Sequence, residues 1–266
     1  MHRSGTSLLA NWLQRCDLHI GDDLVSASVG NTLGHFENVA FLRFHRAVLK
    51  ENGVKGFAAH LPLKIPPEKY ALAREIVAHE SVSPQWGWKD PRTCLFLPFW
   101  KEILPEARFL CVYRHPAAVA DSLRRRISAR KEQQGVTSSK THWRKYRKQY
   151  RKYRHHIDGW TLHNQAILDM AHAHPDDTLI VKTEDLPLQS HLLINHINQH
   201  WGFSLKPVDF NEVYQPKMLR NEVALREKLI SALVSPSSLM VYTQLERERA
   251  KTLQQINGAC SAENGG

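Results

Sequence analysis

The first residues that could do chemistry form a short polar loop at the beginning of the sequence. Residues 2–7 are His-Arg-Ser-Gly-Thr-Ser, and an apolar run typical of a helix follows them. A glycine- and hydroxyl-rich turn at a helix N-terminus directs several backbone N–H groups at one anion, which the helix dipole also favours. The same pattern also occurs as an ordinary helix cap. We interpret it as an anion-binding loop (the anion loop, residues 2–7), whose candidate ligands are Arg3, Ser4, Gly5, Thr6 and Ser7.

The residues in and after the anion loop help to distinguish sulfuryl transfer from phosphoryl transfer. The loop lacks the Gly-Lys-Ser/Thr ending of a nucleotide triphosphatase P-loop. The apolar run 108–113 ends in Tyr113 and Arg114, without the aspartate that would hold the Mg²⁺ of a phosphoryl transfer. A sulfuryl group carries less charge, so arginine, lysine and backbone amides can suffice. The pattern favours sulfuryl transfer with no metal, and a P-loop kinase is the alternative enzyme.

A second candidate anion site follows the apolar run 108–113. Arg114 stands at its carboxyl end, and Ser122 comes eight residues later. Ligands of open α/β sheets bind at the carboxyl ends of the strands, where this arginine and serine could reach one phosphate. Alternatively, Arg114 makes a surface ion pair and Ser122 lies on an exposed helix. We expect the two residues to bind a phosphate together with the anion loop.

The remaining chemistry requires a base and a cation. An attacking hydroxyl needs a proton acceptor within hydrogen-bond reach, an effect worth about 10²–10⁴-fold in rate. His35 and Glu37 are the candidates, although Glu37 could also stabilise the dipole of the helix that follows it. Lys89 would stabilise the charge that builds on the leaving oxygen. Two further cations, Lys217 and Arg220, could reach the donor from the C-terminal region.

Alternating helices and strands must position these residues. Hydrophobic periodicity predicts helices at 6–15, 38–49, 67–79, 94–104, 117–126 and 190–200, and apolar runs predict buried strands at 108–113 and 178–182. This order implies an α/β fold, a single domain with a central parallel sheet flanked by helices. We place the domain at 1–256 and expect a disordered tail at 257–266.

The positive charge is concentrated in one element. The formal net charge is +10, and most of the excess lies in a basic helical segment at about 138–160, with Lys140, Arg144, Lys145, Arg147, Lys148, Arg151, Lys152 and Arg154. The same segment carries an aromatic stripe at helical spacing, made of Trp143, Tyr146, Tyr150, Tyr153, Ile157 and Trp160. The stripe can pack on the domain while the cations stay solvated. Alternatively, the cations attract an acidic acceptor; nucleic acid is the less expected partner.

Bulk features set the remaining expectations. The sequence has no run of ~18 apolar residues, so we expect no transmembrane segment. We see no signal-peptide pattern. The four cysteines are scattered without metal-ligand spacing, which favours free thiols and a cytoplasmic protein.

Four motifs, taken in order, resemble those of the sulfotransferase family that uses 3′-phosphoadenosine 5′-phosphosulfate (PAPS). They are the anion loop, Lys-Asp-Pro-Arg at 89–92, Tyr-Arg-His-Pro-x-x-Val-x-x-Ser at 113–122 and Thr-Glu-Asp-Leu at 183–186. The resemblance runs from residue 1 to about 205, except around 127–156. The Lys-Asp-Pro segment is similar to that of tyrosylprotein sulfotransferases and of many bacterial members.

This resemblance implies the P-loop sulfotransferase fold, with PAPS as co-substrate, 3′,5′-adenosine bisphosphate as product and a glycan, peptide or small-molecule hydroxyl as acceptor. It implies that the anion loop holds the 5′-phosphosulfate and that Arg114 and Ser122 hold the 3′-phosphate. Relatives of the glycan, tyrosylprotein and bacterial types use a glutamate as base, which favours Glu37 over His35. Outside the enzymes, the alternative is a non-catalytic protein that binds anions through the basic segment.

Two departures from the family pattern bear on the donor site. Family members have an apolar strand before the anion loop, whereas this sequence begins inside the loop, so we expect the first strand to be missing and the assigned start to be late. Thr183 stands where relatives have a tyrosine that helps to contact the nucleotide. That donor contact is therefore not expected here.

Overall fold

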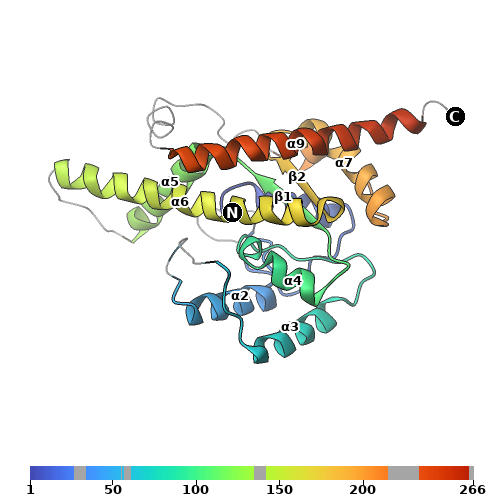
Figure 1. The fold of residues 1–266 in the computed structure, drawn as a ribbon, viewed down its shortest axis with the longest axis horizontal. Coiled ribbons are helices and arrows are strands. Elements are labelled where there is room, and N and C mark those ends of the chain that lie inside the picture. Colours follow the sequence, from blue (N-terminus) through green and yellow to red (C-terminus); the bar gives the residue numbers. More distant parts are fainter. Residues whose placement is uncertain (27–33, 55, 57–60, 135–141, 215–233, 264–266) are drawn as a thin grey trace.

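The computed structural model describes residues 1–26, 34–54, 56, 61–134, 142–214 and 234–263 (Figure 1). Its helices are α1 (Thr6–Arg15), α2 (Val39–Glu51), α3 (Pro67–Glu80), α4 (Leu97–Ile103), α5 (Pro116–Gln133), α6 (His142–Ala173), α7 (Leu186–Trp201) and α9 (Pro236–Glu263). Three short 3₁₀ helices are η1 (Thr93–Leu95), η2 (Pro175–Asp177) and η3 (Phe210–Glu212). The strands are β1 (Phe109–Tyr113) and β2 (Thr178–Lys182).

The two strands form a parallel pair at the centre of the molecule. Their register runs from Phe109 opposite Thr178 to Tyr113 opposite Lys182. The long helices α6 and α9 cross one face of this pair (Figure 1), where Trp160 and Leu245 are fully buried against it. Parallel strands need cover on both faces, which explains why both strands are continuous apolar runs.

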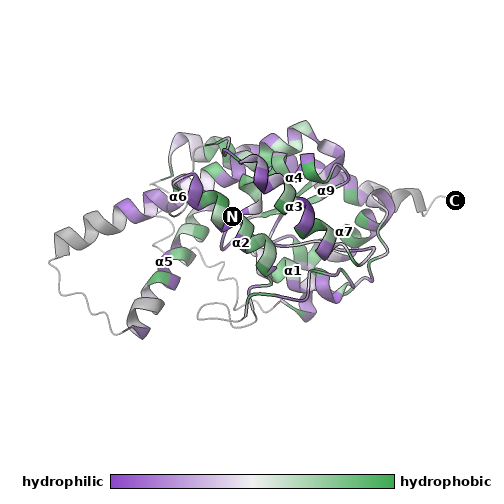
Figure 2. Cartoon of the chain, turned by 90° about the horizontal axis from the view of Figure 1, so that it is seen from below, coloured by the Kyte–Doolittle hydropathy of each residue, from purple (hydrophilic) through white to green (hydrophobic). Residues whose placement is uncertain are grey.

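Helices α1 and α7 supply the cover for the other face. Leu9 and Trp12 of α1 pack with Val112, Leu179 and side chains of α7 in a second apolar cluster. The helices carry bands of both polar and apolar residues, as elements with one buried face do (Figure 2). The α/β class with helices around a parallel sheet is therefore confirmed, although the sheet described is small.

A separate aromatic cluster holds α2, α3 and α4 together. Phe41 of α2 stacks on Trp88 with ring centroids 4.1 Å apart, and Trp100 of α4 packs edge-on against Phe41 at 5.2 Å. These three helices lie together on the side away from α9 (Figure 1). The cluster fixes the segment around Trp88, from which the next residue, Lys89, extends to the candidate site.

Most predicted elements form close to their expected bounds, and one is corrected. The segment 94–104 was expected to be one helix, but it divides at Phe96 into η1 and α4. Pro98 stands in the first turn of α4 and lacks the N–H that would continue a helix from η1. The expected domain ends at residue 256, but α9 continues to Glu263. Residues 257–263 contain no proline that would interrupt the helix.

The basic segment is described from residue 142 onward as the beginning of α6, while residues 138–141 lie outside the described residues. Where side chains are described, the aromatic stripe packs on the domain. Tyr153 and Ile157 bury against Ala117 and Ala120 of α5, and Trp160 lies in the main core. The packing interpretation is thus confirmed for this part of the stripe.

Candidate functional site

The anion loop turns directly into α1, and its glycine is required by its conformation. Gly5 caps the helix at φ +81°, in the left-handed region that glycine tolerates. A Cβ on Gly5 would lie 2.6 Å from Cγ2 of Thr183. Arg3 also has a positive φ of +68°, which is unusual for a residue with a side chain. The loop is therefore held in a specific, tightly packed shape.

Thr183 supports the loop from the end of β2. Its hydroxyl lies 2.8 Å from the Ser4 carbonyl oxygen and 3.0 Å from that of Tyr113, and its own N–H donates to the Tyr113 carbonyl. The Thr183 side chain is thus completely buried under the loop. Its structural role is to join the anion loop to the carboxyl ends of both strands.

The structure brings the two expected anion motifs together. Arg3 Nε of the anion loop donates to Ser122 Oγ of α5 over 2.8 Å. Arg114 is buried beside them, with Nε 3.4 Å from a carboxylate oxygen of Glu184, and Trp160 donates its indole N–H to the Arg114 carbonyl. Residues 119 positions apart in sequence therefore converge at the carboxyl edge of the strands.

Several arginines gather at this corner of the molecule, and two of them lie beside carboxylates, Arg114 next to Glu184 and Arg125 next to Asp121. Burial, and then the charges of Arg126, Arg125 and Arg114, lower the pKa of Arg3 to about 10. Like charges gathered at a half-buried position are unfavourable unless an anion offsets them. Arg125 and Arg126 were not among the residues predicted from sequence. The run Arg124-Arg125-Arg126, directly after Ser122, is the signal that could have indicated them.

Lys89 lies at the other side of the anion loop and contacts three groups. Its Nζ donates to the His35 carbonyl oxygen at 2.6 Å, to Ser7 Oγ at 3.0 Å and to Glu37 Oε1 at 3.3 Å. Burial lowers the pKa of Lys89, and the neighbouring Glu37 partly offsets this. The ammonium group therefore connects the loop to the two candidate bases.

The two candidate bases take different positions. The Glu37 carboxylate is buried and faces both Lys89 and Arg92, whose NH1 is 3.8 Å from Oε2. His35 contributes its backbone carbonyl, which accepts from Lys89 and also from the Ser7 hydroxyl at 3.1 Å. Asn38 then caps α2 through its side chain, which fixes the end of this segment.

A hydrogen-bonded chain that the sequence did not indicate lies behind Lys89. Asp90 accepts from Arg92 and from His45, a buried residue of α2, and Trp100 of α4 donates to the other side of the His45 ring. His45 is 45 positions from Asp90, and as a single histidine on an apolar helix face it gave no sequence signal.

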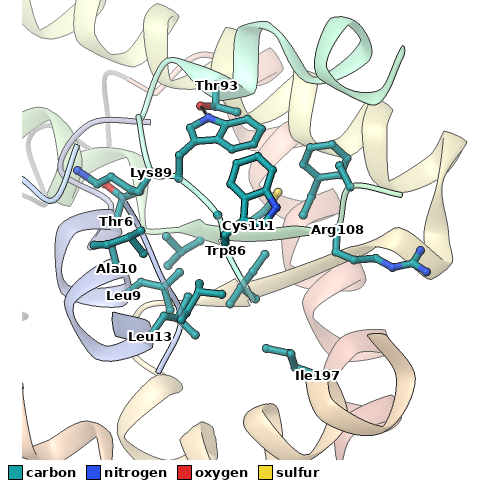
Figure 3. A pocket seen from close by; sticks show the side chains of 18 of the residues that line it. Thr6, Leu9, Ala10, Leu13, Trp86, Lys89, Thr93, Arg108, Cys111 and Ile197 are labelled. Carbon is teal, nitrogen blue, oxygen red and sulfur yellow. Dashed lines mark hydrogen bonds between the residues drawn. The ribbon is translucent and has the colours of Figure 1, made fainter. Parts of the chain in front are cut away.

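An apolar cavity of about 520 Å³ opens beside these groups (Figure 3). Thr6 and Lys89 lie at one end of the view and Arg108 at the other. Its lining comes from α1, from segment 84–91, from β1 and from segment 201–205. Within the described chain β1 has β2 as its one partner strand, and the cavity borders β1.

The remaining expectations concern two cations of the C-terminal region, a metal ion and a membrane span. Lys217 and Arg220 lie outside the described residues. Among the side chains that are described, no group of three His, Cys, Asp or Glu is placed to hold a metal ion. None of the described helices is both long and apolar enough to span a bilayer.

Comparison with known proteins supplies the family. No curated protein and no solved structure matches the chain. A family model described as the sulfotransferase family matches residues 1–207, a range that holds the anion loop, Lys89, Arg114 and Ser122 and covers well over half of the sequence. The chain therefore belongs to the sulfotransferase family, which makes it a transferase.

Proposed function

We propose that this enzyme transfers the sulfuryl group of PAPS to an acceptor hydroxyl. The observation that carries the proposal is the hydrogen bond from Arg3 to Ser122. It places the anion loop and the Arg114 motif side by side, so that one ligand with two anionic ends can contact both. The cluster of Arg3, Arg114, Arg125 and Arg126 suits the dianionic 3′-phosphate of this donor.

The residues around Lys89 suit the chemical step. Glu37 would accept the proton of the acceptor hydroxyl as its oxygen forms a bond to sulfur, while the bond from sulfur to the bridging phosphate oxygen breaks. Lys89 would donate to that bridging oxygen, which keeps the electron pair and becomes part of 3′,5′-adenosine bisphosphate. The Ser7 hydroxyl accepts a hydrogen bond from Lys89 Nζ. From this position it would orient the sulfuryl oxygens.

Donor identity can be tested by calorimetry. The chain should bind 3′,5′-adenosine bisphosphate without Mg²⁺ and more tightly than ATP with Mg²⁺. Arg114→Ala should abolish this binding because it removes a buried cation, whereas Arg247→Ala, an exposed arginine of α9, should leave it unchanged. Tighter binding of ATP with Mg²⁺ would support a kinase instead.

The catalytic assignment needs a separate measurement. Glu37→Gln should keep bisphosphate affinity and lose about 10²–10⁴-fold in kcat, because an amide cannot accept the proton. Glu75→Gln, on the exposed side of α3, is the matched control. Transfer of labelled sulfate into a panel of glycans, peptides and small alcohols would supply the activity. A fully active Glu37→Gln enzyme would exclude Glu37 as the base.

A further inference from the structure

His45 occupies a position where packing alone would favour an apolar side chain. It is fully buried on α2, and its ring lies 4.4 Å from that of Phe96 and 5.7 Å from that of Trp100. A polar ring in such surroundings is unfavourable unless both nitrogens have partners. Both do, and the partners determine which nitrogen carries the proton.

The indole N–H of Trp100 can only donate, and it points at His45 Nε2 over 2.8 Å. Nε2 must therefore accept, which leaves the proton of the neutral ring on Nδ1. That Nδ1–H donates to Asp90 Oδ2 at 2.9 Å. The indole of Trp100 thus fixes one tautomer of His45 and directs its single donor at one carboxylate oxygen of Asp90.

The other oxygen of Asp90 holds Arg92. Oδ1 accepts from the Arg92 backbone N–H at 3.0 Å and from NH1 at 2.7 Å. Burial would raise the pKa of Asp90, but the hydrogen bond from His45 and the charge of Arg92 lower it well below its ordinary value. Asp90 is therefore an anion with both oxygens occupied and one fixed orientation.

Two other histidines face the same groups. His2 of the anion loop and His163 of α6 lie near Asp90 and Arg92, and burial lowers the pKa of each, that of His163 to about 3. Neither adds a charge at neutral pH. The position of Arg92 is thus decided between two carboxylates, Asp90 at 2.7 Å and Glu37 at 3.8 Å.

We propose that His45 is a positioning residue, which fixes Asp90 so that Asp90 keeps the Arg92 guanidinium in a long ion pair with Glu37, at 3.8 Å, rather than in bidentate contact with it. A guanidinium that moved onto Glu37 would bind its carboxylate with two N–H groups and make it a poor proton acceptor. Asp90 also adjoins Lys89, so fixing its side chain restrains the backbone that presents the ammonium group. This role rests on the proposed function of Glu37 as the base.

Two isosteric amides separate positioning from simple core filling. In His45→Asn the amide nitrogen takes the place of Nδ1 and still donates to Asp90, whereas in His45→Gln it takes the place of Nε2 and faces Trp100. Glutamine is closer to histidine in volume, so a filler role predicts that it is the better substitute. Positioning predicts the reverse order. His196→Asn and His196→Gln, at a buried histidine of α7, are the controls.

The sulfate-transfer assay and bisphosphate titration provide the readouts. We expect His45→Asn to keep kcat within about threefold of the original chain and His45→Gln to lose about 10-fold or more, because a hydrogen bond to a buried carboxylate is lost. Bisphosphate affinity should change little in both. Equal kcat values, or a more active His45→Gln, would overturn the inference.

Failure of the proposed function would give a different result. If the unsubstituted protein neither binds the bisphosphate nor transfers sulfate, the tautomer of His45 still tests whether Trp100 and Asp90 orient its ring. A long-range ¹H–¹⁵N spectrum, assigned with His45→Asn, should show the proton on Nδ1. A proton on Nε2 would mean that Trp100 and Asp90 do not hold the ring as described.

Discussion

The environment of Lys89 changes the chemistry of its side chain. Its ammonium is almost buried between the anion loop and Glu37, and this burial lowers the pKa of the side chain. A protonated Lys89 can donate to a leaving oxygen, but the neutral amine is a much weaker donor. Since the pKa is lowered, the charged form is lost at a lower pH than for an exposed lysine. Transfer activity should therefore fall on the alkaline side before ordinary lysines titrate.

The lysine titration can be measured directly. In ¹³C-methylated protein, Lys89 should titrate below the ordinary lysine value of 10.5, and the exposed Lys206, whose pKa is raised by a hydrogen bond to Asp17, should titrate above it. Glu37→Gln should lower the pKa of Lys89 further because Glu37 raises it. Lys89→Arg and Lys206→Arg assign the two signals. If both lysines titrated together, the described burial of Lys89 would be wrong.

Site residues that belong to one short sequence motif could be predicted, whereas residues that only the fold brings together could not. Arg3, Ser4, Gly5, Thr6 and Ser7 could be identified because a loop and the helix after it form one local motif. Lys89 could be identified from its neighbours in Lys-Asp-Pro-Arg. The His45 chain could not, since its geometry depends on how α2 and α4 pack around the segment that contains Asp90.

At the scale of elements, the anion loop depends on a contact with the residue that follows β2. Gly5 has a positive φ and lies against Thr183, while the Thr183 hydroxyl lies near the Ser4 carbonyl. The loop, α1 and the strand end therefore form one unit. The sequence predicted each of these elements within a few residues, yet the contact between them could only come from the folded chain.

A double-mutant cycle tests this unit. Gly5→Ala should cost about 1–3 kcal/mol in the free energy of unfolding, because it strains the backbone and brings a Cβ against Cγ2 of Thr183. Thr183→Ser removes Cγ2 and keeps the hydroxyl, so the double variant should recover part of the loss. Gly53→Ala, at a positive φ in open space, isolates the backbone cost. Additive effects in the cycle would show that loop and strand end are not coupled.

For the molecule as a whole, the expected α/β architecture is confirmed, but with a smaller sheet than a central sheet suggests. β1 and β2 are paired and covered on both faces. His19 and Trp86 form an isolated bridge outside the two strands, and Trp86 and residues of β1 both line the cavity. Strand number depends on such distant pairings, which hydrophobic periodicity does not encode.

Charge is also a property of the whole molecule, and α6 carries much of it. Arg151 and Arg154 are exposed on this helix, while its Tyr153 and Trp160 pack inward. The apolar side therefore has a structural role, and the cations remain available to attract an acidic acceptor. If the cations attract such an acceptor, KM for an acidic glycan or peptide should rise steeply when ionic strength increases beyond ~0.1 M, because salt then screens charges over about 10 Å or less. KM for PAPS should rise less, because the arginine expected to bind its 3′-phosphate, Arg114, is buried and is therefore screened less.

Neutralising the exposed cations separates steering from a general salt effect. Arg151→Gln with Arg154→Gln should raise KM for the acidic acceptor at low salt and flatten its salt dependence, with kcat and bisphosphate affinity unchanged. Arg247→Gln removes an exposed cation from α9 and is the control. A neutral acceptor should respond to neither change, because it gains nothing from the field of α6. If the acidic and the neutral acceptor respond alike, the cations of α6 have no part in acceptor capture, and the helix acts through its packed aromatic side alone.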